Sequence, residues 1–244
     1  MINARSNILC VFEGERREVN YFNNMVENFF NTSSIVHCCY GNDLYELEKS
    51  INSEDDPEDL DIFEVLKENN TVKENDDFFA RYTRDSFNQV YLFFDLEYHD
   101  NLYCPDKVKR LVNLFHEETE LGKLFISYPM VEAIRDIPDY VNFHRYTVSL
   151  DEAQSKIYKS LSAKRLGDFV DPRKITKDKW NALVKASVSK ANFIVNNNKH
   201  LDTHIEQVDI LDAQLNLIAE EKKISVLSSY PMFLRNQFSM ETFV

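Results

Sequence analysis

The sequence predicts an α/β fold in which helices flank a parallel four-stranded sheet and a mainly helical region follows. Three observations predict this fold. Short apolar runs of strand length alternate with segments of helical period over the first 145 residues, charged or turn residues end these runs, and no strand-like run is evident after residue 150. We therefore expect an α/β core at 1–145 and a mainly helical region at 146–244.

The four predicted strands are apolar runs typical of strands buried on both faces of a parallel sheet. They lie at 8–12, 34–40, 90–94 and 124–126. Other segments place apolar residues at helical spacing; they lie at 19–29, 43–52, 60–67, 106–117, 151–162, 176–198 and 202–222. The acidic stretch 54–59 and the polar stretch 69–77 are predicted to be solvent-exposed loops.

Composition indicates a globular chain from a reducing compartment. The hydrophobic fraction of 43% is ordinary for such a chain, and the four cysteines show no C-x-x-C spacing, so we expect neither a zinc site nor a disulfide framework. The N-terminus lacks the basic and apolar segments of a signal peptide, and no run reaches the ~18 apolar residues of a membrane span. We expect a cytoplasmic protein with no membrane partner.

Charge is distributed unevenly, although the net charge is −13. Residues 1–150 carry 14 Lys and Arg against 29 Asp and Glu, whereas residues 156–199 carry 11 against 3. This basic segment is where a polyanion is expected to lie. Its aromatic residues Phe169, Trp180 and Phe193 could stack on bases, but we favour the alternative in which Trp180 and Phe193 lie in the core. Its cations include Lys164, Arg165, Arg173, Lys174, Lys177, Lys179, Lys185 and Lys190.

Carboxylates directly follow two of the predicted strands. Glu13 and Gly14 come after the first strand, and Asp95 and Glu97 come after the third. Ligands of open parallel sheets collect at the carboxyl ends of the strands, and Mg²⁺ prefers oxygen ligands. If the third strand continues through Asp95 and Glu97, both side chains project from the same face. This pattern predicts a divalent metal site and phosphoryl-transfer chemistry.

Other acidic and histidine side chains lie near this edge in the sequence. Glu18 follows Glu13 by five residues and could turn back toward the metal, whereas Glu15 is better explained by the favourable charge of a helix N-terminus. Glu132 follows the fourth strand and is either a further ligand, an orienting base or a solvated residue of a first helical turn. His99 lies on the loop after Asp95, where a surface position is the better interpretation.

These motifs resemble a known family. A strand ending in Glu-Gly, followed by a strand ending in Asp-x-Glu on a parallel core, resembles the TOPRIM domain. The segment 12–22, FEGERREVNYF, is similar to the opening EGE..E.NYF motif of the RloB-like and OLD-type nucleases. The segment 127–132, SYPMVE, is similar to their later S-x-P-x-x-E element. The resemblance covers about residues 7–135.

The resemblance implies a nuclease that uses Mg²⁺ or Mn²⁺ to cleave phosphodiester bonds in DNA or RNA. It also implies the effector role in a bacterial anti-phage defence system with an ABC-type ATPase. Glu13, Asp95 and Glu97 then correspond to metal ligands, with Glu18 and Glu132 as further candidates. The residue Glu97 departs from the family's Asp-x-Asp, and its extra methylene group shifts the carboxylate.

Two further expectations concern residues outside these motifs. The chain has no G-x-x-x-x-G-K-[ST] motif, so an ATPase partner would be a separate protein. In the basic segment, Lys190 is our candidate for neutralising charge that develops on phosphate, and it joins Glu13, Asp95, Glu97 and Glu132 in the predicted catalytic set. A homo-oligomer is possible on this interpretation.

Two alternatives remain open. The chain could be a degenerate TOPRIM module that binds nucleic acid or an ATPase without catalysis. It could also be a HAD-like phosphohydrolase with Asp95 as nucleophile, although that fold usually places its Asp-x-Asp strand near the N-terminus and would leave Glu13 and Gly14 unexplained.

Overall fold

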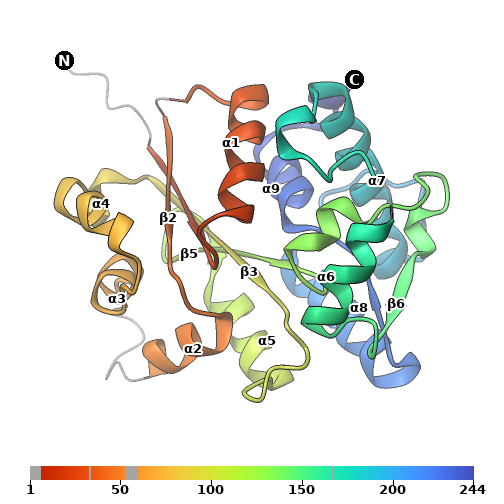
Figure 1. Ribbon diagram of the computed structural model, residues 1–244, viewed down its shortest axis with the longest axis horizontal. Coiled ribbons are helices and arrows are strands. Elements are labelled where there is room, and N and C mark those ends of the chain that lie inside the picture. The colour runs from red at the N-terminus through yellow and green to blue at the C-terminus, as the bar shows by residue number, and fades with distance from the viewer. Residues whose placement is uncertain (1–6, 33, 53–59, 166) are drawn as a thin grey trace. The chain divides into compact units, whose positions relative to one another are not determined.

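The computed structural model describes residues 7–32, 34–52, 60–165 and 167–244 (Figure 1). The predicted acidic loop 54–59 lies outside the described residues. The chain divides into two units, which are described separately. The first consists of Met1–Phe94 and Asp106–Leu124, and the second of Asp95–Pro105 and Phe125–Val244. In the described part of the chain, no helix combines the length and apolar character needed to cross a membrane.

A five-stranded sheet, ordered β2-β1-β3-β5-β4, is the core of the α/β fold. Its strands are β1 (Ile8–Phe12), β2 (Ile35–Cys39), β3 (Gln89–Asp95), β4 (His116–Glu117) and β5 (Gly122–Ser127). The strand β1 pairs in parallel with β2 and β3, and Ile8 lies opposite both Ile35 and Gln89. All four predicted strands are therefore confirmed.

The short strand β4 makes the sheet larger than the predicted four strands, and it pairs antiparallel with β5. It occupies the end of a segment that the sequence predicts as helix 106–117. The helix α5 (Pro105–Leu114) ends before it. A strand of two polar residues carries no alternation that a sequence pattern could detect.

The helices of the first unit follow the predicted pattern except for α4, which the sequence analysis did not predict. They are α1 (Arg17–Phe29), α2 (Leu44–Asn52), α3 (Ile62–Glu68) and α4 (Asp76–Arg81), with most of α5. The helix α1 buries Tyr21, Phe22, Met25 and Val26, which lie on one face at helical spacing. The sheet interior beneath is apolar, since every residue of β1 is buried.

The predicted surface loop 69–77 is wrong in part. It contains η2 (Lys73–Asn75) and the start of α4. The side chain of Asn75 is buried and its amide bonds both the N–H and the carbonyl of Cys39. The Asn75 side chain thus supplies hydrogen-bond partners to the backbone of Cys39 at the outer edge of β2, and the hydropathy of the sequence does not indicate this role.

The second unit is mainly helical, as predicted, but it also contains a two-stranded ribbon. The strands β6 (Thr147–Ser149) and β7 (Lys223–Ser225) pair antiparallel. The expectation of no strand after residue 150 is therefore wrong for β7, whose three residues include one hydrophobic side chain. The helical elements are η4 (Val131–Arg135), η5 (Phe143–Arg145), α6 (Ser155–Lys164), η6 (Pro172–Lys174), α7 (Lys177–Asn196), α8 (Gln207–Glu221), α9 (Ser229–Gln237) and η7 (Met240–Phe243).

The helix α7 is the centre of this unit and packs on η5, α8, α9 and η7. Figure 1 labels α7, α8 and α9. Thr176 caps its N-terminus, and Asn197 ends it in the left-handed conformation with φ 51°. Trp180 is buried, so the core position predicted for it is confirmed. Phe169 is also buried and meets Trp180 edge to face at 5.5 Å. Phe193 is half-buried.

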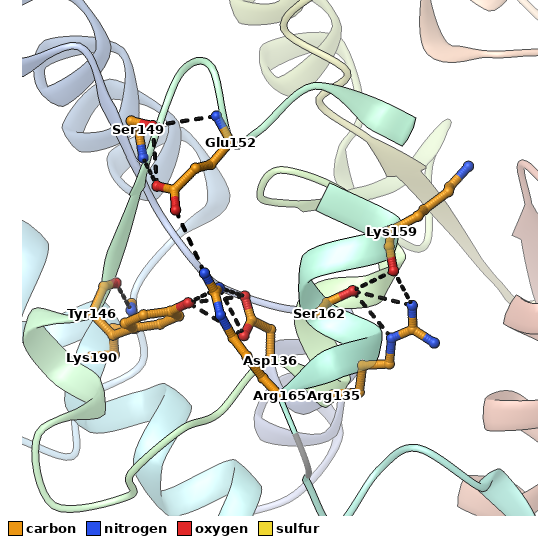
Figure 2. A network of polar contacts seen from close by, with 9 residues as sticks. All are labelled: Arg135, Asp136, Tyr146, Ser149, Glu152, Lys159, Ser162, Arg165 and Lys190. Atoms are coloured by element: carbon orange, nitrogen blue, oxygen red, sulfur yellow. Dashed lines mark hydrogen bonds and ion pairs between the residues drawn. The ribbon is translucent and has the colours of Figure 1, made fainter. Parts of the chain in front are cut away.

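A buried carboxylate organises the polar interior of the second unit (Figure 2). Asp136 is fully buried, and its oxygens accept hydrogen bonds from the Tyr146 hydroxyl and from Arg165 Nη1, at 3.0–3.3 Å. Arg165 also lies 3.6 Å from Glu152. Burial, and then the charge of Asp136, raise the pKa of the Tyr158 hydroxyl. The carboxylate is thus compensated by the Arg165 cation and by the Tyr146 hydroxyl, as a buried charge requires.

We predict that Asp136→Asn destabilises the protein by about 2 kcal/mol. This is below the ~3–5 kcal/mol for breaking a fully buried pair, because Arg165 retains some solvent exposure and its contact with Glu152. Urea unfolding measures the change. Asp171→Asn is the control, since Asp171 pairs with the highly exposed Arg173 and the substitution should change the free energy of unfolding much less than Asp136→Asn does. Equal effects of the two substitutions would contradict the prediction.

Candidate metal centre

Backbone hydrogen bonds on both sides fix the position of Glu13. It directly follows β1, and its N–H donates to the carbonyl of Phe93 in β3 at 3.2 Å. Its own carbonyl accepts from the N–H of Gly41, after β2, at 3.0 Å. The ladder of the sheet thus continues one residue beyond β1 and holds Glu13 at the carboxyl edge.

Gly41 is a positioning residue that the sequence analysis missed. Its φ of 79° is in the left-handed region, and a Cβ there would lie 2.6 Å from Thr71 Oγ1 and 2.7 Å from Val72 Cγ2. Only glycine fits this turn without strain. The available signal was a glycine directly after the second predicted strand.

Asp95 is the last residue of β3 and is only 8% exposed. Because β1 and β3 are adjacent parallel partners, with Phe12 opposite Phe93, the residues that follow them emerge at the same edge of the sheet. This is the placement that the sequence predicts for Asp95 and Glu13.

Glu97 reaches this edge by a different route from the one predicted. The strand ends at Asp95, and Glu97 has φ 38°, so strand alternation does not put the two side chains on one face. Instead, the N–H of Leu96 donates to the carbonyl of Ser127 and the N–H of Glu97 donates to that of Pro129, at 3.1 and 3.3 Å. A left-handed conformation costs a residue other than glycine about 1 kcal/mol, and these bonds hold Glu97 in it.

The three carboxylates gather into one cluster. Glu13, Asp95 and Glu97 each offer an oxygen within 4.8 Å of the others. A set of three carboxylate oxygens is the donor type that Mg²⁺ and Mn²⁺ prefer over softer metals. The donors therefore suit the predicted cation, and the cluster consists of the three residues with the strongest motif signal.

Glu18 lies close to this edge, although it is not part of the cluster. It is in the first turn of α1, and both of its carboxylate oxygens would lie 2.8 Å from a Cβ placed on Gly14. The missing side chain of Gly14 therefore leaves room for Glu18 to fold back over it.

The carboxyl end of β2 is strongly negative as well. The pKa of the Cys39 thiol is raised to about 12, first by burial and then by the charges of Glu18, Glu15 and Glu74. Three carboxylates therefore act on this thiol from nearby. Their field adds to that of Glu13, which lies in the same unit.

Glu132 and His99 do not join the cluster. Glu132 lies in η4 and is fully buried, so the solvated alternative for it is wrong. His99 is exposed, and its Nε2 lies 2.6 Å from the carbonyl of Leu150. The surface position favoured for His99 is confirmed, and a role of Glu132 as ligand or base remains a prediction.

The candidate role of Lys190 at a phosphate is a wrong prediction. Lys190 is fully buried in α7, its Nζ donates to the carbonyls of Phe143 and Tyr146, and it lies 4.1 Å from the centre of the Phe143 ring. Burial lowers its pKa well below the ordinary value, against the opposing charge of Asp136. The amine of Lys190 thus bonds carbonyls of η5 and of the residue that follows it, and it is not exposed to solvent.

The basic segment keeps part of its charge exposed. Lys156, Lys159 and Lys164 are exposed along α6, and no carboxylate within the described ranges pairs with them. Other cations are already compensated, because Arg173 and Lys174 pair with Asp171. The surface of α6 is therefore the better candidate for contacts with phosphate.

Comparison with known proteins adds no relative, because no family model, curated protein or solved structure matches the chain.

We predict that Lys190→Met destabilises the protein by about 2–5 kcal/mol and leaves Mn²⁺ binding intact. The buried carbonyl of Phe143 and the partly buried carbonyl of Tyr146 lose their donor, and each such loss costs about 1–3 kcal/mol. Urea unfolding and a Mn²⁺ titration measure the two effects. Lys185→Met is the control, because Lys185 is exposed on the same helix. Unchanged stability with loss of phosphodiester cleavage would restore the catalytic interpretation.

Proposed function

We propose that the chain is a TOPRIM-type nuclease that hydrolyses phosphodiester bonds in DNA or RNA. The observation that carries this proposal is the cluster of Glu13, Asp95 and Glu97 at the carboxyl ends of two adjacent parallel strands. In the proposal, these carboxylates hold one or two Mg²⁺ or Mn²⁺ ions. When bound, such ions polarise the scissile phosphate and lower the pKa of a bound water.

The residues of the chain itself contribute positioning and charge. The backbone of Glu13 is held from both neighbouring strands, and Leu96 is fully buried between Asp95 and Glu97. Rigid backbone at each ligand favours a fixed ligand geometry. The exposed cations of the basic segment would attract the nucleic acid, which the acidic edge alone repels.

The regulatory part of the proposal rests on the motif resemblance alone. In it, the nuclease acts in the cytoplasm of a bacterium as the effector of an anti-phage defence system and is controlled by a separate ABC-type ATPase. An unrestrained nuclease would endanger its host, which is the physical reason to expect such control.

We predict that Asp95→Asn and Glu13→Gln each reduce the rate of cleavage by at least about 100-fold. Loss of a residue that only hydrogen-bonds a metal ligand already costs up to about 100-fold, and these changes remove a ligand itself. Each change removes one carboxylate charge with little change in size. Thermal stability without metal should stay level or rise, because repulsion within the cluster falls. Plasmid, total tRNA and single strands, each with Mg²⁺, Mn²⁺ or EDTA, are the substrates.

Glu15→Gln is the matched control, because Glu15 lies in the same segment but is exposed and outside the cluster. It should retain activity. Full activity of the Asp95 or Glu13 variant would rule out the metal assignment. Absence of both Mn²⁺ binding and cleavage would favour the non-catalytic module, because a degenerate site should not retain affinity for Mn²⁺. Hydrolysis of phosphomonoesters alone would favour the HAD-like alternative.

We predict that Lys156, Lys159 and Lys164, all changed to Glu, weaken nucleic-acid binding for every sequence. The slope of log K against log salt should flatten by about one unit for each phosphate that the protein no longer neutralises. Filter binding at several salt concentrations gives the slope. The control reverses Lys49, Lys67 and Lys73 in the first unit, which changes the net charge equally. An equal loss in both triple variants would mean that net charge alone is responsible.

A further inference from the structure

The second unit contains a cavity of about 420 Å³ that involves none of the predicted site residues. It lies against the ribbon of β6 and β7 and is also lined by side chains of α7 and α8. Its volume is in the range of cavities that hold small organic ligands. All of its lining belongs to the second unit.

The register of the ribbon determines which side chains face the cavity. Thr147 pairs with Ser225, and Lys223 lies two residues before Ser225 on the same strand. Side chains alternate between the faces of a strand, so Lys223 and Ser225 share one face and Ile224 takes the other. Ile224 is fully buried and does not line the cavity, whereas the other three residues do.

The hydroxyl of Ser225 is a buried polar group without a hydrogen-bond partner in the described part of the chain. Ser225 is only 1% exposed, and its oxygen has no hydrogen-bond partner among the described residues. Its backbone N–H and carbonyl are both bonded to the side chain of Gln214, at 2.9 and 2.7 Å. Buried polar groups are nearly always paired, so a ligand in the cavity that bonds this hydroxyl would recover the cost of its burial.

The walls of the cavity suit a flat apolar group. Phe193 of α7 is half-buried and meets His144 edge to face at 5.0 Å. Ala213 and Leu217 of α8 contribute further apolar surface. An aromatic ring placed against these side chains gains both apolar burial and a ring contact.

The rim of the cavity is cationic. Arg145 is exposed, and no carboxylate of the described chain forms an ion pair with it. Lys223 also lines the cavity, but it is compensated by Glu221, a further lining residue 3.1 Å away, so Arg145 supplies the excess positive charge. The pKa of His144 is lowered, first by burial and then by the charges of Lys199 and Arg145. The local potential therefore favours an anionic group.

We propose that this cavity binds a mononucleotide. The base would lie against Phe193 and Leu217, the hydroxyls of Thr147 and Ser225 would bond its polar edge or the sugar, and the phosphate would lie at Arg145. This proposal goes beyond nuclease activity and does not depend on it, because the two sites share no residue.

The test is calorimetric titration of the full chain with AMP, CMP, GMP and UMP in EDTA, which keeps divalent cations from contributing. At least one mononucleotide should bind about tenfold or more tightly than its nucleoside, ribose 5-phosphate or inorganic phosphate, because only it uses both the walls and the rim. Binding of phosphate as tight as that of every mononucleotide, or no binding by any of them, would overturn the proposal.

Two substitutions of cavity residues test whether the mononucleotide binds in this cavity. Ser225→Ala should weaken mononucleotide binding about tenfold while thermal stability stays level or rises, because a buried hydroxyl without a partner is removed. Arg145→Ala should weaken mononucleotide binding about tenfold and leave nucleoside binding unchanged. Lys49→Ala removes an exposed charge from the first unit and should have no effect. A loss of stability in Ser225→Ala, or unaltered binding in both variants, would contradict the proposal.

Discussion

The candidate site depends on the pairing of β1 with a strand on each side. Hydrogen bonds to β2 and β3 use both edges of β1, and the ladder continues to Glu13, whose N–H and carbonyl are bonded to Phe93 and Gly41. The side chains of β1 are all buried, so apolar packing on both faces stabilises this arrangement. The carboxylate of Glu13 is consequently held at an edge to which the next strand also delivers Asp95.

The sequence was sufficient to predict this much because both features are local. An apolar run with charge at its end predicts a buried parallel strand, and the carboxyl ends of neighbouring parallel strands meet at one edge. The sequence correctly predicted that Glu97 lies in the cluster, but it predicted a continued strand where the backbone of Glu97 is left-handed. Its conformation depends on carbonyls of Ser127 and Pro129, about thirty residues later, and no local pattern contains that information.

Lys190 was misjudged for a different reason. Counting charge over the basic segment ignores which face of α7 each residue occupies. The buried residues Trp180, Leu183, Ser187 and Lys190 recur every three or four positions, so helical periodicity already put Lys190 on the buried face. The short strand β7 carried no comparable signal, because one apolar residue between a lysine and a serine does not define a period.

The buried charges of the second unit are compensated by the protein, whereas the carboxylates of the edge cluster repel one another. Asp136 and Lys190 are each compensated by groups of the protein, so their environment is complete without a ligand. In the edge cluster, like charges approach each other, and two unit charges about 4 Å apart repel by roughly 4 kcal/mol at an effective dielectric constant of 20. A phosphate would add further repulsion. If the proposed function holds, a cation must therefore bind this edge before nucleic acid can, which makes metal binding the first step and substrate binding dependent on it.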